Sequence, residues 1–262
     1  MAHYKLILAY DGTDYHGFQR QAGKASVQAA LEAALRQIGW QGRAVLPAGR
    51  TDSGVHASGQ VVSFQFDWKH EDFALQNALN ATLPPAIAVR SLCQVSPGFH
   101  PRYDALSRSY RYQLYAADTR DPLRDRYAWR LNELPDVGLM NAAAADLPGE
   151  HDFRAFGKAL KEDGTTIRII QRALWQRLGS DGAAFEITGN AFLYHMVRRL
   201  VYVMVAIGQG RQPVELIRRG LQEGSTGIVA LAPGRGLNLV AVTYGEEKKD
   251  GESTLRWKCQ GV

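Results

Sequence analysis

With 262 residues, the chain is long enough for one large domain or two of ordinary size, each with its own hydrophobic core. The formal net charge of +5 and the pI of about 9.2 fit a polyanionic partner, although the basic excess is modest. The two cysteines, Cys93 and Cys259, lie far apart in sequence and form neither a disulfide framework nor a metal-ligand cluster, which indicates a reducing compartment. No apolar run is long enough to cross a bilayer. We therefore expect a cytoplasmic protein that does not enter a membrane.

The first part of the chain alternates strand and helix patterns in the order β-α-β-β-α-β. Ser26 is a good N-cap for the first helix, because a serine hydroxyl can accept a hydrogen bond from the first turn. Pro84-Pro85 ends the second helix. This order predicts a ferredoxin-like unit, with helices on one face of an antiparallel sheet. The predicted strands are 4–10, 43–48, 61–66 and 87–95, and the predicted helices are 27–38 and 72–79.

The same order recurs after residue 106, although no sequence repeat is visible. We therefore predict an α+β fold with two ferredoxin-like halves, 1–106 and 107–245, whose antiparallel sheets flank a basic cleft. Residues 246–262 begin with a charged run and are expected to form a mobile tail. In the second half the predicted strands are 109–115, 166–178, 184–188 and 237–244, and the predicted helices are 135–146, 192–207 and 213–221.

The most informative segment is Gly49-Arg50-Thr51-Asp52-Ser53-Gly54-Val55-His56-Ala57-Ser58-Gly59-Gln60, which connects two predicted strands. A plain hairpin needs only about two to five loop residues, so a loop of this length and polarity calls for another explanation. Asp52 could be an ordinary turn residue that bonds its own backbone. Alternatively, Asp52 is a carboxylate positioned for chemistry, with Arg50 beside it to keep it ionised.

A second segment, 107–115, reads as a strand rich in tyrosine. Because side chains alternate along a strand, Tyr110, Tyr112 and Leu114 share one face, while Arg111 and Tyr115 lie on the other. Tyrosine is a good strand former, so the two tyrosines on the first face could simply belong to the core. A Tyr110 ring in a binding site could instead stack on a nucleic-acid base.

A third segment, 189–200, opens a mostly apolar helix. His195, Arg198, Arg199 and Tyr202 follow the spacing i, i+3, i+4 and i+7, which places them in one polar stripe. Such a stripe could be an ordinary solvated face or the side of a binding site.

Together these segments resemble the tRNA pseudouridine synthase A family. The run Gly-Arg-Thr-Asp-Ser-Gly-Val-His-Ala is similar to its signature loop, and Asn-x-Phe-Leu-x-x-Met-Val-Arg is similar to a later motif. There are two departures: Tyr202 stands where glycine is expected, and Gly234-Arg235 varies the usual Ala-Pro-Ala segment. Shorter matches at 10–13, 17–21, 151–153, 232–233 and 236–237 extend the resemblance over nearly the whole chain.

The resemblance implies an isomerase that converts uridine to pseudouridine in the anticodon stem-loop of tRNA, at positions 38–40, without cofactor or metal. It implies a homodimer as well. Asp52 would be the nucleophile or base, Tyr110 would pack against the target uracil, and Arg198 would pair with the aspartate and hold it ionised. Arg50 would fill the space left by the flipped uridine.

Other residues are expected to bind the RNA. Two rival interpretations remain open: a non-catalytic RNA-binding protein of the same fold, and a hydrolase of nucleoside glycosidic bonds that uses Asp52 with a separate acid. Release of free base would favour the hydrolase. The further substrate-binding candidates are His56 and Gln60 on the loop, with Arg20, Arg102, Lys158, Lys161 and Arg199 as possible phosphate contacts.

Overall fold

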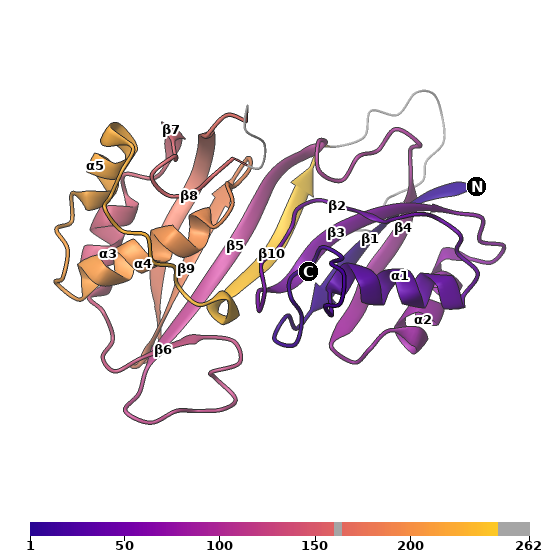
Figure 1. Ribbon diagram of the computed structural model, residues 1–262, viewed down its shortest axis with the longest axis horizontal. Helices are drawn as coiled ribbons and strands as arrows, with labels where there is room; N and C mark the ends of the chain where they lie inside the picture. The colour runs from indigo at the N-terminus through magenta and orange to yellow at the C-terminus, as the bar shows by residue number, and fades with distance from the viewer. Residues whose placement is uncertain (160–163, 246–262) are drawn as a thin grey trace. The chain divides into compact units, whose positions relative to one another are not determined.

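The computed structural model describes residues 1–159 and 164–245, so the expected tail at 246–262 lies outside the described residues (Figure 1). The fold is mixed α+β, as predicted. Ten strands, paired mostly antiparallel, and five α-helices are present in the described part of the chain. The described residues form two compact units, one comprising 1–53, 57–106 and 241–245 and the other comprising 54–56 and 107–240. None of the helices in these ranges has the length and apolar character needed to cross a bilayer.

In the first unit the strand order is β4-β1-β3, with β1 antiparallel to both neighbours and the short β2 paired to β3. The expected strand over 43–48 is shortened to two residues. The strand is short because the backbone N–H of Val45 donates to the Glu32 side chain at 3.2 Å instead of to a neighbouring strand. The elements are β1 (Ala2–Tyr10), α1 (Val27–Gln37), β2 (Leu46–Pro47), β3 (His56–Phe66), α2 (Asp72–Thr82) and β4 (Ile87–Val95).

The core of the first unit follows the two periodicities of the sequence. On β1, Tyr4, Leu6 and Leu8 are buried at every second position, and on α1 Leu31 and Leu35 are buried one turn apart. Each such leucine contributes roughly 1.5–3 kcal/mol when its side chain leaves water. Helix α1 contacts α2, and α2 contacts β4, so the two helices cover the sheet of this unit (Figure 1).

In the second unit the strand order is β10-β5-β9-β8-β7, and β6 pairs in parallel with β5. Helix α3 packs against β8 and α4, and α5 packs against α4 and β7 (Figure 1). Strands β6 and β7 were not predicted, because three or four residues are too few to show an alternating pattern. The elements are β5 (Ala105–Ala116), β6 (Trp129–Leu131), α3 (Val137–Ala144), β7 (Gly149–Asp152), β8 (Ile167–Leu178), β9 (Gly182–Gly189), α4 (Met196–Gly208), α5 (Leu216–Glu223), the 3₁₀ turn η1 (Gly234–Gly236) and β10 (Leu237–Tyr244).

Helix α4 is the central element of the second core. Nearly all of its residues are buried, and Met204 accepts a hydrogen bond at its sulfur from the Trp175 indole at 3.3 Å. The predicted helix start at 192 is wrong by four residues. His195 adopts a left-handed conformation (φ 66°), which interrupts the helical path, and the helix begins at Met196.

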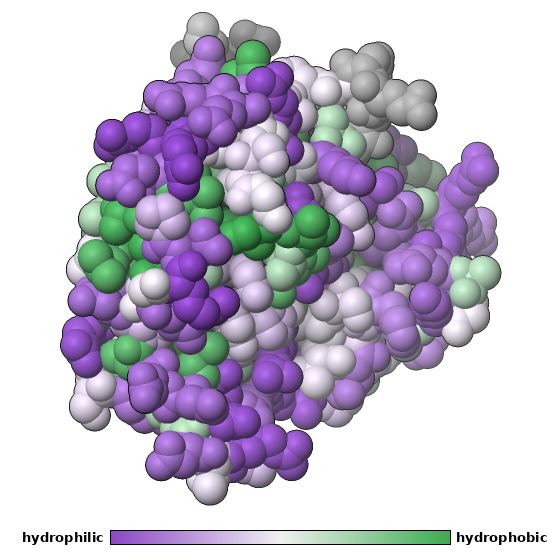
Figure 2. Space-filling view, turned by 60° about the vertical axis from the view of Figure 1, so that its left-hand side comes forward, coloured by the Kyte–Doolittle hydropathy of each residue, from purple (hydrophilic) through white to green (hydrophobic). Residues whose placement is uncertain are grey.

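The surface combines polar side chains with scattered apolar ones. Figure 2 shows one face on which hydrophilic residues predominate and hydrophobic areas are enclosed by them. On β8, Ile167 and Ile169 are exposed at alternate positions, while Ile170 between β7 and β9 is buried. Single exposed apolar residues of this kind are ordinary on folded proteins.

Candidate functional site

The Asp52 loop connects β2 to β3, and its backbone is held by contacts to the residue before the aspartate. Thr51 is buried; its hydroxyl lies 2.8 Å from the Tyr10 phenol oxygen, and its carbonyl accepts a hydrogen bond from the Phe18 N–H at 3.1 Å. Asp52 itself is half-buried. Thr51, which is hydrogen-bonded through both its side chain and its backbone, therefore fixes the chain next to Asp52.

Two further contacts fix the flanks of the loop. Gln60 on β3 is fully buried, and its amide donates to the Gly49 carbonyl at 3.0 Å. On the other flank the Ser53 hydroxyl donates to the Tyr15 carbonyl at 3.4 Å. Arg50 is exposed between these fixed points. The arrangement is a rigid backbone that carries one exposed cation and one half-buried carboxylate.

Tyr10 is a neutral support for this loop. Burial raises the pKa of the Tyr10 phenol to about 12, and its hydrogen bond with Thr51 only partly opposes that effect. The phenol therefore keeps its proton across the physiological range and can both donate and accept hydrogen bonds.

The middle of the signature segment, residues 54–56, groups with the second unit. His56 is buried, its Nε2 lies 3.1 Å from the Arg235 carbonyl oxygen, and its ring centroid is 5.1 Å from that of Tyr127. The histidine thus bonds η1, the turn that precedes β10. This contact fixes the turn.

Tyr110 and Arg198 both lie in the second unit. Tyr110 stands on β5 opposite Ile187 of β9, and its ring meets the edge of Phe192 at a centroid distance of 5.1 Å. It is only partly buried, whereas Tyr112 on the same strand is fully buried. Arg198 lies in the first turn of α4, and its Nε donates to the Ala232 carbonyl at 2.8 Å. One end of the Arg198 guanidinium is therefore fixed in direction.

Tyr112 is hydrogen-bonded to the residue just before η1. The Tyr112 hydroxyl donates to the Pro233 carbonyl at 2.9 Å, and burial raises the pKa of this phenol far above its usual range. The positive charges of Arg198 and Arg235 partly oppose this rise in the pKa of Tyr112. Neither Tyr112 nor Arg235 was among the expected site residues. Tyr112 lies in the alternating pattern of a strand and could simply belong to the core. Arg235 lies in the segment where this sequence departs from the family pattern.

The residues expected to contact phosphate differ in their exposure and in their partners. The Arg20 guanidinium is half-exposed and bonded to the buried Glu32 carboxylate at 2.5 Å. Arg102 is exposed and lies 5.8 Å from the Tyr103 ring centroid. Lys158 is exposed, and Arg199 is half-buried on α4. Lys161 lies outside the described residues.

The expected residues are divided between the two units. Arg50 and Asp52 on the loop and Gln60 on β3 belong to the first unit, while Tyr110, Arg198 and Arg199 belong to the second unit. Within residues 1–159 and 164–245, no three His, Cys, Asp or Glu side chains gather so that they could hold a metal ion.

The sequence matches a known protein family over most of its length. The family model described as tRNA pseudouridine synthase matches residues 6–104 and 143–245. This chain belongs to that family. The first matched range contains the Asp52 loop and the second contains Arg198, while Tyr110 falls between them.

Curated relatives carry the printed name tRNA pseudouridine synthase A. The protein from Limosilactobacillus fermentum is 36% identical over 249 residues, which cover 93% of this chain and 96% of the relative. The one from a Geobacter species is 40% identical over 252 residues, or 94% of this chain and all of the relative. The one from Neisseria gonorrhoeae is 44% identical over 223 residues, which cover 84% of this chain and 83% of the relative.

Proposed function

We propose that this member of the tRNA pseudouridine synthase family isomerises uridine to pseudouridine in the anticodon stem-loop of tRNA, at positions 38–40. The observation that carries the proposal is the Asp52 loop. A half-buried carboxylate stands on a backbone held at Thr51, Gly49 and Ser53, within the range that matches the family. Such preorganisation is what a group acting on a reacting bond requires.

The reaction needs no group donor and no redox equivalent. The bond between N1 of the uracil and the ribose carbon breaks, the uracil turns, and C5 bonds to the same ribose carbon. The hydrogen on C5 is lost as a proton, and N1 takes up a proton. Asp52 serves as nucleophile or base in this sequence, whether it attacks the ribose, adds to the base or removes a ribose proton. Each of these roles requires the ionised carboxylate.

Tyr110 and Arg198 are proposed to complete the site. The partly buried Tyr110 ring is held edge-on by Phe192, which supports a role in packing against the flipped uracil. Stacking of a base on an aromatic ring contributes about 1–3 kcal/mol. Arg198, with its Nε fixed by Ala232, would pair with the aspartate and favour its ionised form by charge attraction.

Base flipping and RNA binding are assigned to the remaining candidates. Arg50, exposed on the loop, would occupy the space of the flipped uridine, whose unstacking costs a few kcal/mol. Gln60 would act through Gly49, because its own side chain is buried. The proposed contacts to RNA are Arg20, Arg102, Lys158, Lys161 and Arg199, and the buried His56 would act through its bond to Arg235.

We also propose that the two units are ferredoxin-like halves flanking a basic cleft, and that the protein is a cytoplasmic homodimer. The strand order β4-β1-β3-β2 in the first unit and β10-β5-β9-β8 in the second support the ferredoxin-like part. Light scattering tests the oligomeric state: a mass of twice 29.0 kDa is expected, and a mass of 29.0 kDa contradicts the dimer.

The specificity is tested with tRNA transcripts in which the uridines at positions 38, 39 and 40 are replaced singly by cytidine. Pseudouridine is then mapped by chemical modification and primer extension. We expect each product stop to vanish with its own uridine. Stops only outside the anticodon stem-loop would contradict the assignment, and free uracil in solution would favour the hydrolase. A flat salt dependence of binding would also count against it, since each neutralised phosphate gives a slope of about −0.7 to −0.9.

A further inference from the structure

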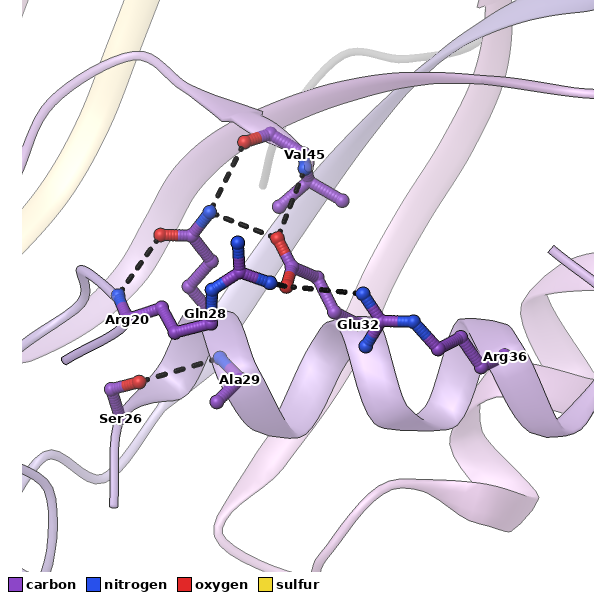
Figure 3. A network of polar contacts seen from close by, with 7 residues as sticks. All are labelled: Arg20, Ser26, Gln28, Ala29, Glu32, Arg36 and Val45. Atoms are coloured by element: carbon purple, nitrogen blue, oxygen red, sulfur yellow. Dashed lines mark hydrogen bonds and ion pairs between the residues drawn. The ribbon is translucent and has the colours of Figure 1, made fainter. Parts of the chain in front are cut away.

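We propose that Glu32, a buried carboxylate on α1, is a positioning residue for the Asp52 loop. The inference rests on the function proposed above for Asp52. The hydrogen-bond partners of Glu32 outside α1 are Arg20 and Val45, so it would act on the signature segment through residues 17–20 and through Val45. All of these residues belong to the first unit, and Figure 3 shows how Glu32 meets Arg20, Gln28 and Val45.

The Glu32 side chain is completely buried and surrounded by donors. Its Oε1 accepts from the Gln28 amide at 2.9 Å and from the Val45 N–H at 3.2 Å. Its Oε2 accepts from the Arg20 guanidinium at 2.5 Å, and Arg36 approaches to 3.6 Å (Figure 3). A buried carboxylate is tolerable only when such partners satisfy it, and removing it leaves the partners unsatisfied. Glu32 therefore ties three segments of the chain to one point.

The first of these connections leads to the Asp52 loop through the segment 17–20. The backbone N–H of Arg20 donates to the Gln28 side chain at 3.0 Å, and the backbone N–H of Gln28 donates to the Phe18 carbonyl at 2.9 Å. On its other side Phe18 donates its own N–H to the Thr51 carbonyl at 3.1 Å. The segment is thus bonded to α1 on one side and to the residue before Asp52 on the other.

The second connection leads to the same loop from its N-terminal end. Val45 is bonded by its N–H to Glu32 and by its carbonyl to the Gln28 amide at 3.5 Å. Three residues later, Ala48 donates its N–H to the Val61 carbonyl of β3 at 2.8 Å. Glu32 and Gln28 together therefore set where the chain enters the loop and where Phe18 meets it.

The chemistry of the side chain makes the charge essential to this role. A glutamine at position 32 has nearly the same shape, but it offers one acceptor oxygen and places an NH₂ donor where the second oxygen stood. That donor would face either Arg20 or the Val45 N–H. The connected backbone must then shift, and Thr51 and Asp52 shift with it.

The test is single-turnover conversion of tRNA with enzyme in saturating excess. Under these conditions the rate constant reports the bound complex and does not depend on the folded fraction, so a purely structural defect leaves it unchanged. We expect Glu32→Gln to lower this rate constant about ten- to hundredfold, because displacements near 1 Å reduce rates by such factors. The dissociation constant for tRNA should stay within about threefold of wild type, since uniform binding is not affected.

The matched control is Arg36→Gln, which removes the distant, half-exposed partner of the same carboxylate together with the contact of Arg36 with the Trp40 ring. Its rate constant should stay within about twofold of wild type, because the half-exposed Arg36 guanidinium lies 3.6 Å from Oε2 and this oxygen keeps its bond to Arg20. A wild-type rate constant for Glu32→Gln would overturn the inference, and so would equal losses in both variants. If Glu32→Gln does not fold, Gln28→Met takes its place, and an unchanged rate constant in that variant overturns the inference equally.

An Asp52→Asn variant separates this inference from the proposed function. If Asp52→Asn is inactive and Glu32→Gln is as fast as wild type, only the positioning role fails. If Asp52→Asn keeps full activity, the proposed function of the loop fails first.

Discussion

Replacement of Gly17 by alanine should damage both the stability of the first unit and the rate of the reaction. Gly17 has φ +87°, and a Cβ built on it would lie 2.5 Å from the Thr51 carbonyl oxygen and 3.2 Å from the carbonyl carbon of Asp52. The left-handed backbone alone costs an alanine about 1–2 kcal/mol. To reach an ordinary contact of 3.4 Å, the Thr51 oxygen must move by about 0.9 Å, and such crowding adds about 1–3 kcal/mol.

Gly23→Ala is the matched control in the same connection. Gly23 has φ +70°, but a Cβ there meets nothing within 4 Å, so this variant tests the backbone strain without the crowding. Urea unfolding should show Gly17→Ala to be less stable than Gly23→Ala by about 1–3 kcal/mol. In single-turnover assays only Gly17→Ala should lose rate, by about a hundredfold for a displacement near 1 Å. Equal stability and equal rates in the two variants would refute the reasoning.

Three further predictions concern the buried phenols of Tyr10 and Tyr112 and the guanidinium of Arg198. Because the folded-state pKa of Tyr10 is about 12 and its unfolded value is near 10, its stabilising contribution is complete below pH 10. That contribution is lost as the pH rises from 10 to 12. Over this range the free energy of unfolding, measured by urea titration, should fall by up to about 2–3 kcal/mol more in wild type than in Tyr10→Phe. Parallel pH dependences of the two proteins would contradict this. Tyr112→Phe leaves the Pro233 carbonyl without its donor and should lower the free energy of unfolding by about 1–2 kcal/mol, whereas an unchanged urea midpoint would show that this bond contributes nothing. Arg198→Lys removes the Nε–H that donates to the Ala232 carbonyl, so the single-turnover rate should drop at least about tenfold with tRNA affinity retained. A selective loss of affinity instead would make Arg198 an RNA-binding residue.

The strongly periodic elements could be predicted from the sequence because their burial depends on local patterns. The alternation of Tyr4, Leu6, Leu8 and Tyr10 gave β1, and all four are buried. Ser26 caps α1 as expected, its hydroxyl accepting from the Ala29 N–H at 3.4 Å. These features need no knowledge of distant contacts.

Other features depend on partners far away in the chain. β2 is short because the Glu32 and Gln28 side chains take the backbone bonds of Val45, and no local pattern reveals such competition. The late start of α4 depends on the left-handed His195, a conformation that is uncommon for any residue with a Cβ.

In the candidate site, too, features with a local sequence pattern could be predicted and features that depend on distant partners could not. The Asp52 loop was visible because its length and its polar residues exceed what a turn requires. The Glu32 network was missed, because glutamate on a helix is ordinarily solvated. A signal was present: Gln28, Glu32 and Arg36 follow one another at i, i+4 spacing, beside the apolar row of Leu31 and Leu35.

The central claim is that Asp52 drives the isomerisation of uridine in tRNA. Its most direct test is to incubate the protein with unmodified tRNA transcripts that carry tritium at C5 of uridine, with Asp52→Asn as the control. Formation of the new bond at C5 must release the tritium to water. We expect release by wild type and none by Asp52→Asn, which should still bind tRNA. Release at equal rates by both proteins, or by neither while tRNA is bound, would contradict the account.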